Sequence, residues 1–171
     1  MISLARQPWC VASALLVPLV TLGSPGWLKL AGVAPAWAVL WLLPWALVDG
    51  PVSGTLAGLG VGLMQDALHP GPLSTLPALV VLGWWWGRLG RRSRIQRSFN
   101  LGLLALLGSV LLAGSLILQQ RLWQLQDPAA WHTLLAQSLL TAVLAPVLCS
   151  LQLRLWRSRS QAFLPVPALR R

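Results

Sequence analysis

Acidic residues are almost missing from this chain. Asp49, Asp66 and Asp127 are its only acids among 171 residues, and glutamate and tyrosine are absent. Two histidines, His69 and His132, complete the small set of candidate acid or base groups. Ion or proton transport through a bundle of helices requires a relay of Asp, Glu or His side chains. We therefore do not expect this chain to be a pump.

Catalytic sequence motifs are lacking as well. No HExxH, GxSxG or phosphate-loop pattern occurs. Asp66 and His69 stand three residues apart, a spacing that can share a ligand on one helical turn, but Pro70 follows immediately, and we interpret them as polar residues at a helix end. Cys10 and Cys149 are too few and too far apart for a metal cluster or a disulfide framework. We expect no enzymatic activity, no catalytic residues, no cofactor and no metal site.

Charge of any sign is scarce, and apolar residues dominate. Only 9% of the residues are charged and 56% are hydrophobic, with a mean hydropathy of +0.69. Soluble domains average about 25% charged residues. The apolar residues form successive runs instead of the mixed pattern that wraps one soluble core. The composition predicts an all-α integral membrane protein, with the lipid bilayer as its main solvent.

The charges that are present are mostly arginines, and they follow apolar runs. The net charge is +10. One cluster comprises Arg88, Arg91, Arg92, Arg94 and Arg97, and the other comprises Arg154, Arg157, Arg159, Arg170 and Arg171. Arginines next to helix ends mark cytoplasmic loops and attract anionic headgroups. We therefore expect a membrane surface, and not nucleic acid, to face these arginines.

Breaks at proline, glycine and charge divide the chain into about six transmembrane helices in a single domain. The expected helices lie near residues 8–23, 31–48, 51–66, 73–87, 98–119 and 130–153, and a basic cytoplasmic tail follows at 154–171. The first segment also has the outline of a signal peptide, but its Gly23-Ser24-Pro25-Gly26 end is a poor processing site. The pair from 31 to 66 is the least certain, and a re-entrant hairpin is its alternative.

An even number of spans fixes the expected orientation. Six helices place both termini on the same side of the membrane, and the two arginine clusters then fall together. With the N-terminus in the cytoplasm, Arg6 and both clusters put eleven positive residues inside, which leaves Lys29 and Arg121 outside. This bias agrees with the positive-inside rule.

Eleven tryptophans are distributed in two patterns. The first group lies at predicted helix ends, where tryptophan anchors a membrane interface; its members are Trp9, Trp27, Trp84, Trp85, Trp86, Trp123, Trp131 and Trp156. The second group, Trp37, Trp41 and Trp45, recurs every four residues and therefore shares one face of the second helix. We expect these three side chains to face lipid or to pack, in preference to binding a ligand.

The sharpest pattern is a glycine stripe in the third helix. Gly50, Gly54, Gly58 and Gly62 stand at strict four-residue intervals, and Asp66 continues the spacing. Each step advances about 400° around a helix, so the glycines form one slowly winding groove. Small residues at this spacing let another helix approach its backbone. We expect the groove of Gly54, Gly58, Gly62 and Asp66 to pack a neighbouring helix of this chain or to bind the helix of a partner.

This segment, GPVSGTLAGLGVGLMQDALHPGPL, resembles the rod shape-determining membrane protein family MreD. That family has a glycine-rich helix with a Gly-Leu-x-x-Asp ending, then a short loop that contains glycine. Gly62, Leu63, Asp66 and Gly71 match those positions. The flanks WLLPWALVDG and LVVLGWWWGRLGRR are similar to those of cyanobacterial members, whereas Leu73-Ser74 stands where many members place a further glycine.

The resemblance implies a non-enzymatic scaffold of bacterial cell elongation. Its expected partners are an MreC-like bitopic membrane protein, the elongation synthase and transpeptidase and, indirectly, the actin-like MreB. The family's bundle also resembles the substrate-binding components of energy-coupling-factor vitamin transporters, which have about six helices. A small-molecule uptake component is therefore the alternative, although the few polar residues within the spans argue against a lined pocket.

Overall fold

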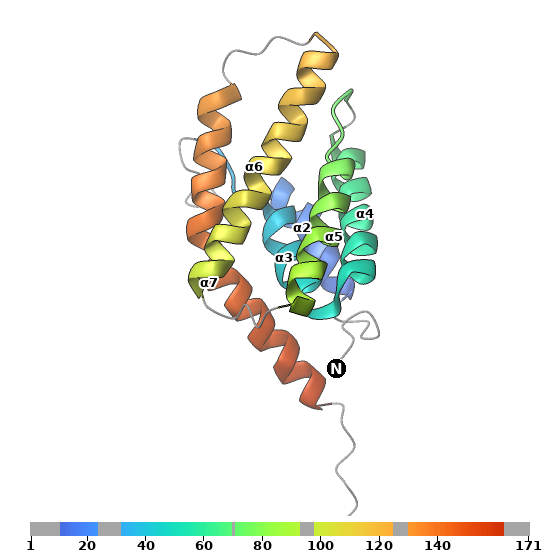
Figure 1. Cartoon of the computed structure of the whole chain (residues 1–171), viewed down its shortest axis with the longest axis vertical. Coiled ribbons are helices and arrows are strands. Elements are labelled where there is room, and N and C mark those ends of the chain that lie inside the picture. Colours follow the sequence, from blue (N-terminus) through green and yellow to red (C-terminus); the bar gives the residue numbers. More distant parts are fainter. Residues whose placement is uncertain (1–10, 24–31, 70, 93–97, 125–129, 163–171) are drawn as a thin grey trace, which may run out of the picture.

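The computed structural model describes residues 11–23, 32–69, 71–92, 98–124 and 130–162, which fold into a bundle of helices (Figure 1). After a short 3-10 turn, η2, six α-helices follow within these ranges. They are η2 (Ser13–Leu15), α2 (Leu16–Leu22), α3 (Trp37–Asp49), α4 (Pro51–Leu68), α5 (Leu76–Arg92), α6 (Ser98–Leu122) and α7 (Ala130–Ala162). The described ranges hold no β-strand, and the all-α expectation is confirmed.

Two of these helices are long and apolar enough to cross a membrane. They correspond to Asn100–Leu122 of α6 and His132–Trp156 of α7. Two shorter helical stretches, Ser13–Leu22 and Trp37–Asp49, are also apolar. At 1.5 Å per residue, the thirteen residues of α3 rise only about 20 Å, which is less than the ~30 Å of a bilayer's hydrocarbon core.

The second helix begins later than the sequence pattern suggests. We expected it from residue 31, but residues 32–36 are not helical. Pro35 has no N–H to continue a helix, and it restricts the preceding residue to extended backbone. Gly32 has φ +85°, a conformation outside the right-handed helix.

Two later helices extend beyond the apolar runs from which their expected ends were drawn. Helix α5, which corresponds to the expected fourth helix, ends at Arg92 and not near residue 87, and α7 continues to Ala162 and not to 153. Arginine is a good helix former, so charge ends an apolar segment without ending the helix. Residues 154–162 of the expected tail are therefore helical, whereas 163–171 lie outside the described residues.

Helix α3 is the centre of the bundle. It packs on α2, α4, α5, α6 and α7, and every residue from Ala38 to Ala46 is buried. An apolar helix that is buried on all sides needs its ends satisfied within the protein. The backbone N–H of Ala36 donates to Thr141 Oγ1 of α7 at 3.0 Å, and the Cys149 thiol lies 3.6 Å from the carbonyl oxygen of Leu40. These contacts seat α3 against α7.

The longest helix, α7, bends in its middle (Figure 1). Pro146 lies inside it and cannot donate a hydrogen bond to the carbonyl of Ala142. Gly102 of α6 faces this point: a Cβ there would lie 3.2 Å from the Ala142 oxygen and 3.5 Å from the Pro146 ring. The absence of a side chain at Gly102 thus lets α6 pack closely on the bend.

Several tryptophans expected at the membrane interface are core residues instead. Trp86 is fully buried, and Trp156 is 7% exposed. The Trp156 ring meets Trp41 and Trp45 edge to face, with centroid distances of 6.4 and 5.6 Å. The interface expectation was wrong for Trp86 and Trp156 because each ring finds a partner on a distant helix. Trp84 and Trp123 are exposed, whereas Trp85 packs against the core.

The tryptophan stripe of α3 also packs inward. Trp41 and Trp45 are buried and stacked on each other at 5.0 Å, and Trp37 is partly buried. Their indole N–H groups are satisfied by short polar side chains: Trp41 donates to Ser13 Oγ at 2.9 Å and Trp45 to Ser53 Oγ at 3.1 Å. The packing interpretation of the stripe therefore holds for Trp41 and Trp45.

Trp86 and Gly108 make a tight contact between α5 and α6, which can be tested. A Cβ on Gly108 would collide with the six-membered part of the Trp86 ring. We expect Gly108→Ala to destabilise the chain by about 1–3 kcal/mol, because a packed core resists added volume. Trp86→Phe removes the colliding ring atoms, together with an indole N–H that has no hydrogen-bond partner among the described residues, and should restore most of the loss in the double variant.

The measurement is the thermal unfolding midpoint in detergent. The matched control is Gly114→Ala in the same helix, where an added Cβ meets no atom within 4 Å. Equal midpoints for Gly108→Ala and Gly114→Ala would show that the contact with Trp86 is not tight.

Candidate functional site at the hairpin of α4 and α5

The glycine stripe lies on the buried face of α4. Gly54, Gly58 and Gly62 are all buried, and Gly50 forms the one-residue link to α3 with φ +97°. Only glycine adopts that conformation readily, so the same residue starts the stripe and turns the chain. The pattern read from the sequence therefore corresponds to one continuous packing face.

Helix α5 covers this face within the same chain. A Cβ on Gly54 would collide with the carbonyl of Gly83, one on Gly58 with the carbonyl of Leu79, and one on Gly62 would lie 2.8 Å from Leu76 Cα. The two backbones therefore touch along the stripe, which is how small residues bring helices together in lipid. The groove that the sequence offered to a neighbouring or a partner helix is filled by α5.

A second set of glycines on α5 completes the contact. Gly83, Gly87 and Gly90 face the backbones of Gly54, of Gly50 and Pro51, and of Leu47, respectively, too closely for any side chain. These glycines were not among the expected site residues. Their spacing of four and three residues was the available signal, because it places them on one face of a helix.

Asp66 ties the loop after α4 to the start of α5. One carboxylate oxygen accepts from the backbone N–H and hydroxyl of Thr75, both at 2.8 Å, and the other accepts from the Ser74 hydroxyl at 2.6 Å. Thr75 immediately precedes α5, and its carbonyl accepts the backbone N–H of Leu79. A carboxylate at this position also interacts favourably with the positive N-terminal end of the α5 helix dipole. Asp66 thus caps α5 from the preceding helix.

Two glutamines connect this end of the hairpin to other helices. The side chain of Gln119 in α6 accepts from the Ser74 backbone N–H and donates to the Ser74 carbonyl, each at 2.7 Å. Gln65 of α4 donates to Thr21 Oγ1 of α2 at 3.2 Å. The loop is therefore fixed on three sides, by α4, α5 and α6. Neither glutamine stood out in the sequence, because nothing in the local pattern indicates a contact 44 or 45 residues away.

His69 does not join Asp66 in a site. Its Nδ1 lies 3.4 Å from the Gln65 carbonyl oxygen, the side chain is exposed, and the oxygens of Asp66 are engaged by the loop. Among the described residues, no group of three or more His, Cys, Asp or Glu side chains could hold a metal ion. The arrangement at Asp66 therefore holds backbone in place and offers no free acid or base.

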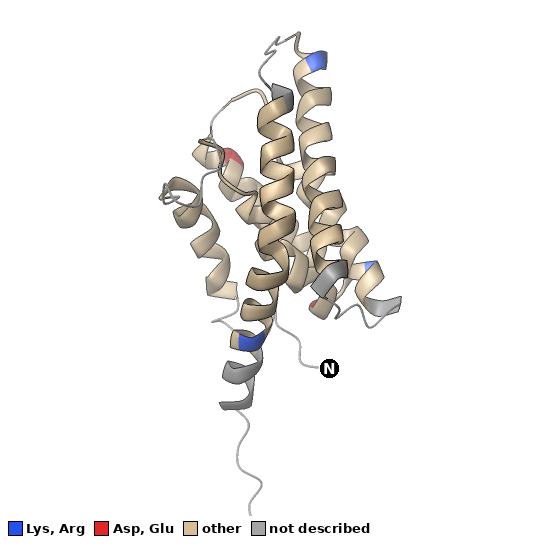
Figure 2. Ribbon diagram, turned by 90° about the vertical axis from the view of Figure 1, so that its left-hand side faces the viewer, with Lys and Arg blue, Asp and Glu red and all other residues tan. Residues whose placement is uncertain are grey.

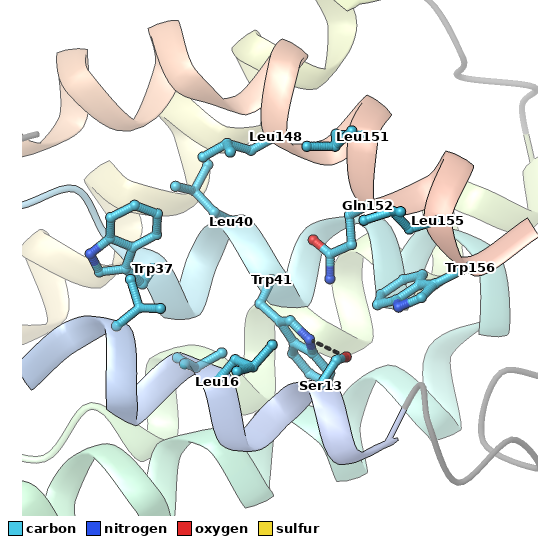
Figure 3. A pocket seen from close by; sticks show the side chains of 12 residues that line it. Ser13, Leu16, Trp37, Leu40, Trp41, Leu148, Leu151, Gln152, Leu155 and Trp156 are labelled. Carbon is cyan, nitrogen blue, oxygen red and sulfur yellow. Dashed lines mark hydrogen bonds between the residues drawn. The ribbon is translucent and has the colours of Figure 1, made fainter. Parts of the chain in front are cut away.

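A cavity of about 270 Å³ lies elsewhere, between α2, α3 and α7 (Figure 3). Most of its lining is leucine, valine and tryptophan, and the polar residues are Ser13 and Gln152. The hydroxyl of Ser13 accepts the hydrogen bond from Trp41. Figure 3 shows the Gln152 amide directed into the cavity between Trp41 and Trp156, and no described residue forms a hydrogen bond with it. No pattern in the sequence predicted this cavity.

Comparison with protein-family models, with curated proteins and with solved structures finds no match to this chain.

Proposed function

We propose that this chain is a multi-pass scaffold of the bacterial cell-elongation machinery, of the MreD type, located in the inner membrane with both termini in the cytoplasm. Its partners in this proposal are an MreC-like bitopic protein and the elongation synthase and transpeptidase, with an indirect connection to the actin-like MreB. The role is non-enzymatic, and the chain contributes to the regulation of cell shape.

The observation that carries the proposal is that the MreD-like segment packs against α5 and caps its start. The absence of a side chain at Gly62 lets Leu76 of α5 pack closely on α4. Asp66 caps α5 through the loop that contains Gly71. Gly62 and Asp66 match the family pattern and act in packing and capping, which is expected in a scaffold, whose product is a shaped surface. The segment therefore supports an organising role, and nothing in it calls for a substrate.

Apolar side chains on the outside of the bundle support the membrane location. Exposed residues on α4 are Val52, Leu56, Leu59 and Leu63, and those on α7 include Leu135, Leu139, Val143, Val147, Leu151 and Leu155. Apolar patches of this extent are rare on soluble monomers. Lipid satisfies them, and short helices such as α3 are accommodated where the protein buries their ends.

The arginines support the orientation. The C-terminal ends of α5 and α7 lie at one end of the bundle and that of α6 at the other (Figure 1). Arg88 and Arg154 therefore lie toward one end and Arg121 toward the other, and the basic positions in Figure 2 follow this separation. Arg88 also lies 4.9 Å from the centre of the exposed Trp84 ring, a pair suited to a headgroup region.

Because α5 occupies the glycine groove, the outward face of α4 is the part of the MreD-like segment that remains for a partner. Leu56 and Leu59 lie on that face, 65% and 41% exposed. A single-pass helix from an MreC-like protein fits such an apolar surface, since transmembrane helices associate through close van der Waals packing. Docking there leaves the hairpin intact.

Complementation of a depleted bacterial host tests the proposal. We expect depletion to give rounded or widened cells and wild-type chain to restore rods, whereas Leu56→Trp should fail to do so and should co-purify about tenfold less MreC-like partner, as for loss of one interface hot spot. Leu139→Trp on α7, at a similarly exposed leucine, is the matched control and should behave as wild type. Normal cell shape after depletion would refute the scaffold role.

The cavity between α2, α3 and α7 favours one alternative, a substrate-binding component of an energy-coupling-factor vitamin transporter. Vitamin sites need several convergent polar groups, and this cavity offers Ser13, already bonded to Trp41, and Gln152. A growth defect that depends on an external vitamin, in depleted cells of normal shape, would favour transport over the scaffold.

A further inference from the structure

Proline divides the longest helix, α7, into two segments. Pro146 has no N–H, so the carbonyl of Ala142 lacks its helical hydrogen bond and the helix bends there (Figure 1). The segment before the bend is anchored at Thr141, which is fully buried and whose Oγ1 accepts the backbone N–H of Ala36 at 3.0 Å. We name the segment after the bend, residues 147–156, the α7 arm. Pro146 is the point at which the arm can turn relative to the anchored segment.

Helix α6 supports only the beginning of the α7 arm. Gly102 of α6 faces Pro146, and the two helices run antiparallel (Figure 1). Helix α6 begins at Ser98, four residues before Gly102, so it reaches about residue 150 of α7. On the side toward α2, Leu151 and Leu155 of the arm line the cavity. Among the described helices, α3 is the other one that makes an extensive contact with α7, so the arm depends on α3 for its packing.

Two contacts of different strength hold the α7 arm on α3. The Cys149 thiol lies 3.6 Å from the carbonyl oxygen of Leu40, which Pro44 leaves without a helical donor. A thiol is a weak hydrogen-bond donor, so this contact is the weaker one. At the far end of the arm, the Trp156 ring is 7% exposed and meets the two stacked tryptophans of α3 edge to face. Trp156 is therefore the main attachment of the arm.

We propose that the α7 arm is a conformational device that swings about Pro146 and is latched on α3 by Trp156. The structure shows the latched state, and release separates Cys149 from Leu40. Beyond Trp156 the helix continues to Ala162, into the basic tail of the sequence. A partner bound to that tail would therefore act directly on the latch. Neither the hinge nor the latch requires the proposed scaffold role.

The reactivity of Cys149 reports release of the α7 arm. Cys149 is 0% exposed, so a maleimide reaches its thiol only when the arm opens, and Cys10→Ser leaves it as the single cysteine of the chain. In the full chain, purified in mild detergent, Trp156→Ala should speed labelling by N-ethylmaleimide about tenfold or more, because two edge-to-face ring contacts and the burial of a large ring are lost. Trp123→Ala, at an exposed tryptophan, is the matched control and should label at the parent rate.

Pro146→Ala tests the hinge in the opposite direction. Alanine supplies the N–H that the Ala142 carbonyl lacks, so it should stiffen the bend. In the Trp156→Ala background, labelling of Cys149 should then slow about fivefold, the effect of one hydrogen bond. General destabilisation cannot produce this protection. Unchanged or faster labelling in the double variant would place the motion away from Pro146 and overturn the hinge.

A second buried thiol distinguishes release of the α7 arm from loosening of the whole bundle. Val61→Cys places this thiol on α4, at a position that is 2% exposed, in a chain that also carries Cys10→Ser and Cys149→Ser. Trp156→Ala should leave labelling at position 61 unchanged. Equal acceleration at positions 61 and 149 would show general destabilisation and overturn the latch.

Distances between spin labels test the swing directly, by double electron–electron resonance in a chain without its native cysteines. Leu56→Cys on α4 is paired with Leu151→Cys on the arm or with Leu139→Cys before the bend, two leucines that are similarly exposed. Trp156→Ala should broaden the distances from 56 to 151 and leave those from 56 to 139 unchanged. The same change, or none, in both pairs would refute a separate arm.

The outcome is independent of the proposed function. All of these readouts come from isolated protein, whereas the scaffold role is read from cell shape and partner co-purification. Failure of the scaffold proposal therefore leaves the hinge and the latch unaffected, and failure of the hinge leaves the scaffold proposal intact.

Discussion

Gly58→Leu should prevent the chain from reaching a folded state. Its Cβ alone would collide with the backbone of Leu79 and Val80, and backbone cannot move aside as a side chain can. Even Gly58→Ala should cost several kcal/mol, at or above the ~1–3 kcal/mol of ordinary overpacking. The measurement is the yield of monodisperse protein in detergent, together with the thermal midpoint where protein is recovered.

The control lies two residues away in the same helix. An added Cβ on Gly60 meets no atom within 4 Å. Gly60→Ala should be neutral or slightly stabilising, since alanine favours a helix over glycine by about 1 kcal/mol, and Gly60→Leu should be tolerated. Similar loss of folded protein for substitutions at Gly58 and Gly60 would indicate a general intolerance of α4 and not a tight contact with α5.

Asp66→Ala is expected to destabilise the bundle by about 2–4 kcal/mol, because it removes a charged acceptor of three hydrogen bonds and leaves the Thr75 N–H at the start of α5 unpaired. For a chain of this size that corresponds to a fall in the thermal midpoint of roughly 5–10 °C. Asp66→Asn keeps one acceptor oxygen, so its loss should be intermediate.

A double-mutant cycle separates capping from a general effect of charge. Thr75→Val removes the hydroxyl that donates to Asp66 and keeps the backbone N–H. If Asp66 acts through this contact, the losses of Asp66→Ala and Thr75→Val should not add, as expected for residues within one network. Additive losses would place the effect of Asp66 outside the contact with Thr75.

Much of the local architecture follows from the glycine and proline residues that separate helices in the sequence. Gly50-Pro51 and the loop after His69 divide helices where the structure divides them, and the four-residue glycine period correctly indicated a packing face. These features were readable because glycine and proline act on the backbone within one or two residues. The helix that packs on the stripe could not be predicted, because neighbouring and distant helices fit a glycine groove equally well.

Contacts between distant residues account for what the sequence did not reveal. Trp86 and Trp156 look like interface anchors until Gly108 and the Trp41–Trp45 pair come beside them. The amide of Ala36 finds its acceptor 105 residues later. A cavity has no sequence signature, since it forms where the side chains of three helices leave space between them.

The hairpin of α4 and α5 also bears on how the chain enters a bilayer. Neither helix is among those that are long and apolar enough to cross a membrane alone. Glycine contributes little hydrophobic area, so each helix taken singly has only a weak tendency to enter lipid and leaves its backbone uncovered along one face. Packed along Gly54, Gly58 and Gly83, the two cover that backbone together. In the proposed membrane location, the unit that partitions from the insertion machinery into lipid is therefore the pair, and its biogenesis should stall until both helices have been synthesised.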